Sequence, residues 1–144
     1  EPYKSSLYNQ SYKVFMCIYL YSVCVLKLGV VQLSGEPIDF SVLTNIFGDD
    51  KELCDSILEE FSNSAEPYML ELKQAFEEGC SDGVKSLAHK LKSSSRTVGA
   101  EELGDLCQIL ESSAPGRDWT LIDSQQLAVQ KALAQVVNFI HESK

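Results

Sequence analysis

The chain is poor in the residue patterns that build disulfide frameworks and metal centres. It has five cysteines, an odd number, and no two of them show the short spacing typical of a zinc site. Its two histidines lie far apart in the sequence, at positions 89 and 141. We therefore expect reduced thiols, which are typical of a cytoplasmic protein, and no metal bound by this chain.

Positive charge is also scarce. The chain has 12 Lys and Arg residues against 21 Asp and Glu residues, a formal net charge of −9 at pH 7 and a pI near 4.6. This balance argues against nucleic acid as the main partner, because nucleic-acid binding depends on contacts between cationic side chains and phosphates. The glycine-rich phosphate loops of nucleotide-binding folds are missing too, so we expect no autonomous kinase or ATPase activity.

No uninterrupted apolar run is long enough to cross a bilayer. The longest, residues 14–26, would span about 20 Å as a helix, against roughly 30 Å of hydrocarbon. Extended through Lys27 to residue 31, it could still associate with a membrane. We favour packing against protein, either on the rest of the chain or on a second copy of it. A mistranslated leader is the third interpretation that stays open.

From residue 38 onward, apolar residues recur at the three- and four-residue spacing of amphipathic helices. We expect residues 1–37 to be an apolar extension with a linker, and residues 38–144 to be one all-α domain. Its expected form is an up-down-up-down four-helix bundle with a short N-terminal lid helix. The expected helices are residues 40–47, a long helix from Asp49 or Asp50 to about 78 that is kinked at Pro67, 81 or 82 to 98, 100–114, and 120 to about 141.

The helix expected over residues 81–98 separates a core stripe from a cationic face. Its apolar and small residues lie within roughly 60° of Val84 on a helical wheel, whereas His89 lies about 140° away and is predicted to face water. Lys85, Lys92 and Arg96 share the side of His89, so we expect Lys92 to face solvent as well. This face carries no carboxylate that could orient the imidazole. The stripe consists of Val84, Leu87, Ala88, Leu91, Ser95 and Val98.

The residues around this histidine read Ala-His-Lys-Leu-Lys-Ser-Ser-Ser-Arg-Thr-Val-Gly-Ala, from Ala88 to Ala100. Leu103, Cys107, Leu110 and Glu111 then follow at helical spacing. This string closely resembles the signature of histidine-containing phosphotransfer (HPt) domains, and the resemblance extends roughly from residue 38 to the C-terminus.

The resemblance implies a role for each residue at the matching positions. His89 would carry a phosphoryl group on Nε2, and Lys92 would attract that group. Ser93 stands where the family usually has a glycine that lets a partner approach closely. Ser94 and Ser95 match small positions where helix packs on helix. Lys85, Lys90, Ser93 and Arg96 would form the surface that meets the partner.

The function implied by the resemblance is that of a phosphocarrier. A response-regulator receiver domain, which binds Mg²⁺ itself, would donate a phosphoryl group from its aspartate to His89, and a second receiver would take it. A neutral imidazole offers the lone pair that this step needs. The chain itself would bind no cofactor. We expect it to be the C-terminal module of a bacterial hybrid sensor histidine kinase, cytoplasmic even where that kinase is membrane-bound.

Three other functions make different demands on the sequence. The dimerisation domain of a histidine kinase usually has an acidic residue directly after its histidine, where this chain has Lys90. A metal-binding bundle would need Glu-x-x-His pairs, and the chain has none. A non-catalytic scaffold tethered through the apolar N-terminal segment, with His89 inert, stays open on the sequence.

Overall fold

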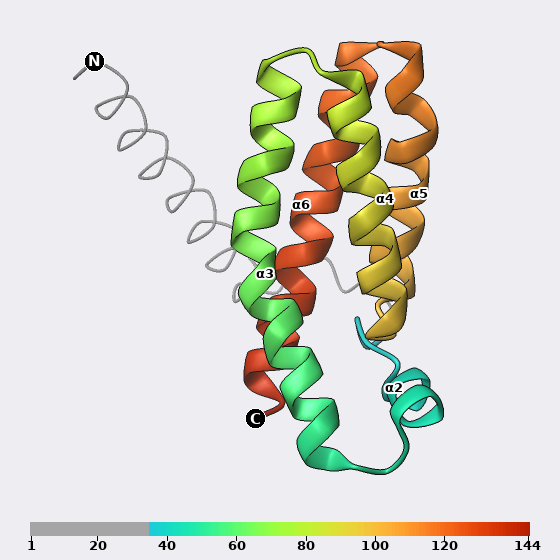
Figure 1. Cartoon of the computed structure of the whole chain (residues 1–144), viewed down its shortest axis with the longest axis vertical. Coiled ribbons are helices and arrows are strands. Elements are labelled where there is room, and N and C mark those ends of the chain that lie inside the picture. The colour runs from blue at the N-terminus through green and yellow to red at the C-terminus, as the bar shows by residue number, and fades with distance from the viewer. Residues whose placement is uncertain (1–34) are drawn as a thin grey trace, which may run out of the picture. The chain divides into compact units, whose positions relative to one another are not determined.

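The computed structural model describes residues 35–144, and residues 36–144 form one compact unit. Every regular element in this part is helical, and the four long helices run alternately up and down (Figure 1). This confirms the predicted all-α bundle with a short helix in front of it. The elements are α2 (Phe40–Phe47), α3 (Lys51–Glu77), α4 (Ser81–Thr97), α5 (Glu101–Ser113), the 3-10 turn η1 (Ala114–Gly116) and α6 (Trp119–Glu142). The apolar segment 14–31 lies outside the described residues.

Three of the helices begin at an aspartate whose side chain accepts a backbone N–H of the first turn. Asp39 caps α2, Asp50 caps α3 and Asp118 caps α6. This arrangement satisfies donors that have no partner inside the helix. The predicted cap of the last helix at Thr120 was therefore wrong by two residues, because Asp118 provides the cap.

Helix α4 begins at Ser81, one of the two predicted starts. Its capping residue is Cys80, whose Sγ accepts the N–H of Gly83 at 3.3 Å, and Ser81 is already helical. Pro67 lies inside α3, which continues through it as one helix of 27 residues. The continuity of the apolar pattern on both sides of this proline explains why the helix is not divided there.

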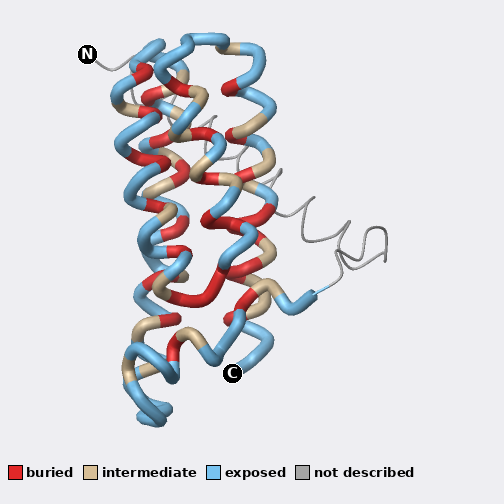
Figure 2. The backbone as a smooth tube through the Cα atoms, turned by 90° about the vertical axis from the view of Figure 1, so that its right-hand side faces the viewer, coloured by how far each residue is buried: buried red, intermediate tan, exposed pale blue. Residues whose placement is uncertain are grey.

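The core lies along the axis of the bundle, where buried positions of the four long helices face one another (Figure 2). All six residues of the predicted stripe on α4 are buried, and Val84 and Ser95 are fully so. Ser95 satisfies its hydroxyl by donating to the carbonyl of Leu91 at 2.6 Å. The buried stripe fixes the rotation of α4 and therefore the direction in which His89 points.

The short helix α2 is attached to the turn between α4 and α5. Gly99 has a φ of +80°, and the N–H of Asp39 donates to its carbonyl at 2.9 Å. A Cβ atom at position 99 would lie 2.2 Å from the carbonyl oxygen of Asp39, a distance that no side chain tolerates. Glycine is thus required here both by the left-handed backbone and by the close approach of α2. Ile38 and Leu43 are each only 1% exposed beneath this attachment.

Within residues 35–144, none of the helices is both long enough and apolar enough to span a membrane.

Candidate functional site

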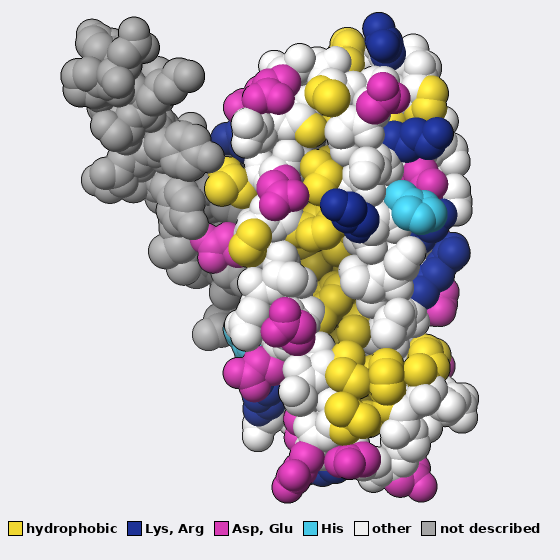
Figure 3. Space-filling view, in the orientation of Figure 1, with side chains coloured by type: hydrophobic (Ala, Val, Ile, Leu, Met, Phe, Trp, Pro, Cys, Tyr) yellow, Lys and Arg dark blue, Asp and Glu magenta, His cyan; other side chains and the backbone are white. Residues whose placement is uncertain are grey.

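His89 lies on the outer face of α4, near the middle of the helix. Its side chain is 61% exposed, as the helical wheel predicts. Lys85 and Lys90 on the same helix are exposed too. Figure 3 shows dark-blue cationic side chains beside the cyan histidine along α4, whereas acidic side chains predominate over α3. The imidazole is therefore accessible to another macromolecule and lies in a locally cationic region of an acidic protein.

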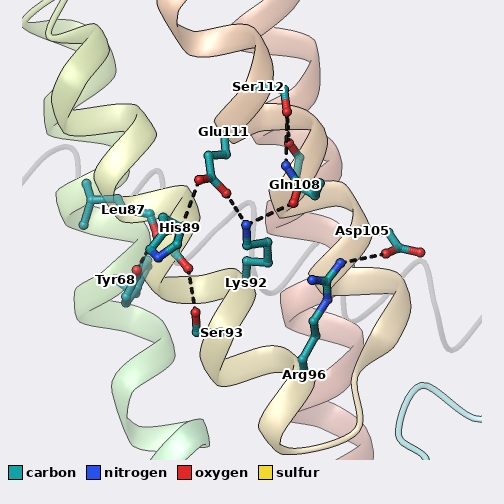
Figure 4. Close-up of polar contacts among 10 residues, drawn as sticks. All are labelled: Tyr68, Leu87, His89, Lys92, Ser93, Arg96, Asp105, Gln108, Glu111 and Ser112. Carbon is teal, nitrogen blue, oxygen red and sulfur yellow. Dashed lines mark hydrogen bonds and ion pairs between the residues drawn. The ribbon is translucent and has the colours of Figure 1, made fainter.

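A carboxylate from the neighbouring helix holds the imidazole. Oε1 of Glu111 on α5 lies 2.9 Å from Nδ1 of His89 (Figure 4). A carboxylate can only accept, so this contact requires Nδ1 to carry the proton, and a neutral ring then has its lone pair on Nε2. In the sequence, Glu111 stands out only as part of the stretch that resembles the HPt signature, and we expected no carboxylate to orient the ring. That expectation was wrong because it considered α4 alone.

The hairpin of α4 and α5 accounts for this meeting. The two helices are antiparallel and joined by a short turn, so residues at equal distances from Ala100 come to face each other. His89 and Glu111 are each eleven residues from it, and Lys92 and Gln108 are each eight. Both pairs are hydrogen-bonded directly, and Lys92 also donates to Glu111. Counting outward from the predicted turn makes Glu111 one candidate on the facing helix, and the register of the two helices decides that it is the residue that meets the ring.

Lys92 does not face solvent, which corrects the prediction made from the wheel. Its side chain is only 13% exposed, and its Nζ lies 2.5 Å from Oε2 of Glu111 and 3.0 Å from Oε1 of Gln108. Its position three residues after His89 turns it toward α5, so its aliphatic stem packs in the interface and its ammonium reaches the carboxylate. The hydrogen bond from Lys92, followed by that from His89, holds the pKa of Glu111 below its usual value, although burial opposes this.

Arg96 and Ser93, the other two residues predicted to meet the partner, lie in different surroundings. Arg96 is two turns further along α4, where its guanidinium lies 3.3 Å from a carboxylate oxygen of Asp105 and 3.9 Å from one of Glu101. Its stem crosses Gly104, where an added Cβ would lie 3.0 Å from Cγ of the arginine. Ser93 is exposed one turn after His89 and donates to the carbonyl of His89 at 3.2 Å. Arg96 is therefore engaged with α5, whereas Ser93 lies on the open face beside the histidine.

Helix α3 contributes a tyrosine behind the site. The hydroxyl of Tyr68 donates to the carbonyl of Leu87, two residues before His89, and burial raises the pKa of this tyrosine. The contact ties α3 to the turn of α4 that carries the histidine. Among residues 35–144, no group of three His, Cys, Asp or Glu side chains is arranged to hold a metal ion.

Comparisons with known proteins bear on the family and the fold of this chain. The family model described as Hpt domain matches residues 56–139. A solved structure of similar fold is histidine-containing phosphotransfer protein B (HptB) from Pseudomonas aeruginosa PAO1, with a TM-score of 0.70 and 22% sequence identity. The alignment covers 76% of this chain and 96% of that one, and at this identity the likeness is one of fold. No curated protein matches. Since the family model matches more than half of the chain, the protein belongs to the Hpt domain family, the histidine-containing phosphotransfer domains of two-component phosphorelays.

Proposed function

We propose that His89 accepts a phosphoryl group from the phospho-aspartate of a receiver domain and passes it to the aspartate of a second response regulator. The observation that carries this proposal is the state of the ring, which is exposed, with Nδ1 held by Glu111 and Nε2 left to react. Accessibility alone would suit any surface histidine. An exposed ring whose Nδ1 is already hydrogen-bonded, so that Nε2 keeps its lone pair, suits a nucleophile.

The transfer step needs few groups from this chain. The lone pair of Nε2 attacks phosphorus, a nitrogen–phosphorus bond forms, and the bond from phosphorus to the aspartyl oxygen breaks, which returns that aspartate as a carboxylate. The Nδ1 proton stays between the ring and Glu111, whose negative charge offsets the positive charge of the phosphorylated imidazole. Mg²⁺ belongs to the receiver in this proposal, and the chain itself binds no cofactor.

The surrounding cations have separate roles in this proposal. Lys85 and Lys90 are exposed and favour the approach of the acidic receiver pocket, an effect that added salt weakens. Lys92 lies one turn from His89 and places its positive charge close to the incoming phosphoryl group. Ser93 and Arg96 would lie at the edge of the area that the receiver covers.

The test is incubation with a receiver domain carrying labelled phosphate. We expect acid-labile, alkali-stable label on the protein, and loss of that label in His89→Gln. His141→Gln is the matched control because it removes the other histidine, which lies near the end of α6, and it should be labelled normally. Equal labelling of His89→Gln and the parent would reject His89 as the phosphoryl acceptor, and an absence of label on the parent with every receiver would favour the scaffold.

A further inference from the structure

The carboxylate of Glu111 serves two partners at once. One oxygen lies 2.9 Å from Nδ1 of His89 and the other lies 2.5 Å from Nζ of Lys92 (Figure 4). This sharing bears on a conflict in the chemistry of the site. A carboxylate beside an imidazole orients the ring, but it also favours the imidazolium, which has no lone pair for attack on phosphorus.

Lys92 is fixed in a way that surface lysines are not. Its side chain is 13% exposed, and its ammonium also donates to Oε1 of Gln108 at 3.0 Å. Gln108 is itself held, because its Nε2 donates to the hydroxyl of Ser112 at 3.1 Å. Gln108 and Glu111, one turn apart on α5, thus hold the ammonium of Lys92 in place before any phosphoryl group arrives.

We propose that Lys92, held by Gln108, is a positioning residue that offsets the charge of Glu111, so that the carboxylate orients the imidazole of His89 without drawing a second proton onto it. This inference rests on the proposed function of His89 as a nucleophile. It gives Lys92 a role in the unphosphorylated protein that is separate from attraction of the phosphoryl group. It also brings in Gln108, which the sequence did not single out.

The other charged groups around the imidazole are less well placed for this role. On α4, Lys85 and Lys90 are exposed to solvent and screened by it. On α5, Asp105 is engaged with Arg96. Helix α3 brings Tyr68 against the neighbouring backbone, with the exposed Glu71 one turn along.

Lys92 is the cation that contacts Glu111 directly within the described part of the chain. Its hydrogen bond is the largest cause of the lowered pKa of Glu111, so the carboxylate stays ionised while its charge is compensated.

Nuclear magnetic resonance titration of the His89 ring in the unphosphorylated protein tests the inference. In Lys92→Met, which keeps the aliphatic stem and removes the charge, we expect the titration midpoint to move to higher pH. The ratio of protonated to neutral ring at pH 7 should rise about threefold or more. Lys92→Arg should restore the midpoint of the parent. Gln108→Met should move it in the same direction as Lys92→Met, by less.

Lys85→Met is the matched control, since it removes an exposed cation on the same side of α4 that does not contact Glu111. Its effect should be clearly smaller than that of Lys92→Met. An unchanged or lowered midpoint in Lys92→Met, or one equal to that of Lys85→Met, would overturn the inference. Circular dichroism confirms that each variant is folded.

This titration needs no receiver, so its failure is distinguishable from failure of the phosphocarrier role. If His89 takes no label from any receiver but its midpoint still rises in Lys92→Met, the positioning role stands and the carrier role falls. If His89 is labelled but its midpoint does not move, the carrier role stands and the positioning role falls.

Discussion

The substitution Gly99→Ala should destabilise the protein more than the same change at a second helix end with nearly the same backbone. Gly79 and Gly99 follow α3 and α4, with φ of +64° and +80°. In both turns the next N–H returns to the carbonyl five residues earlier, from Cys80 to Ala75 and from Ala100 to Ser95. Both glycines thus occupy the left-handed position of the same helix-ending motif.

The surroundings of the two glycines differ. A Cβ at Gly79 would meet only a ring carbon of Trp119 at 3.8 Å, an ordinary contact, whereas at Gly99 it would lie 2.2 Å from the carbonyl oxygen of Asp39. The left-handed backbone alone costs an L-residue about 1–2 kcal/mol, so Gly79→Ala should lose about that much. At Gly99 the carbonyl must retreat by more than an ångström to reach ordinary contact.

That retreat would break the hydrogen bond from Asp39 to Gly99, which contributes about 0.5–1.5 kcal/mol. It would also loosen the packing of Ile38 and of Leu43, the buried residue of α2. We therefore expect Gly99→Ala to lose about 3 kcal/mol, which corresponds to roughly 12 °C in Tm for a domain of this size.

Urea unfolding followed by circular dichroism measures both free energies of unfolding. Hydrogen exchange should show faster exchange at the N–H groups of α2 in Gly99→Ala and unchanged exchange there in Gly79→Ala. Equal losses of stability in the two variants, within about 0.5 kcal/mol, would refute the close approach of α2 to the turn.

Two further predictions concern the core and the site. Leu91→Ala should lose about 2–5 kcal/mol of unfolding free energy by leaving a cavity in the core, whereas Ile109→Ala, at a half-exposed position, should lose less than about 1 kcal/mol; urea unfolding checks both. The lowered pKa of Glu111 means that its ion pair adds stability above the usual pKa of a glutamate and loses it as the pH falls through the lowered value. As the pH is lowered from 5, the free energy of unfolding should therefore fall less in Glu111→Gln than in the parent protein. Urea unfolding at several pH values measures this, and equal falls in the two proteins would contradict the reasoning.

Periodicity in the sequence was sufficient to predict the helices, their number and the face that each one buries. The stripe from Val84 to Val98 on α4 is buried as predicted, and the exposure of His89 follows from it. The start of α6 was predicted less well, because Asp118 provides the cap in place of the nearby Thr120. A capping preference is weak, and several adjacent residues satisfy it equally.

The sequence by itself determined that this chain forms a helical bundle with one solvent-facing histidine in a cationic stretch, since the apolar period of a helix fixes which side chains point inward. Only the tertiary structure decided what lies across from that histidine. The antiparallel register of α4 and α5 brings Glu111 to Nδ1 and turns Lys92 away from solvent. These contacts depend on where one helix lies against its neighbour, and the period of a single helix carries no information about that.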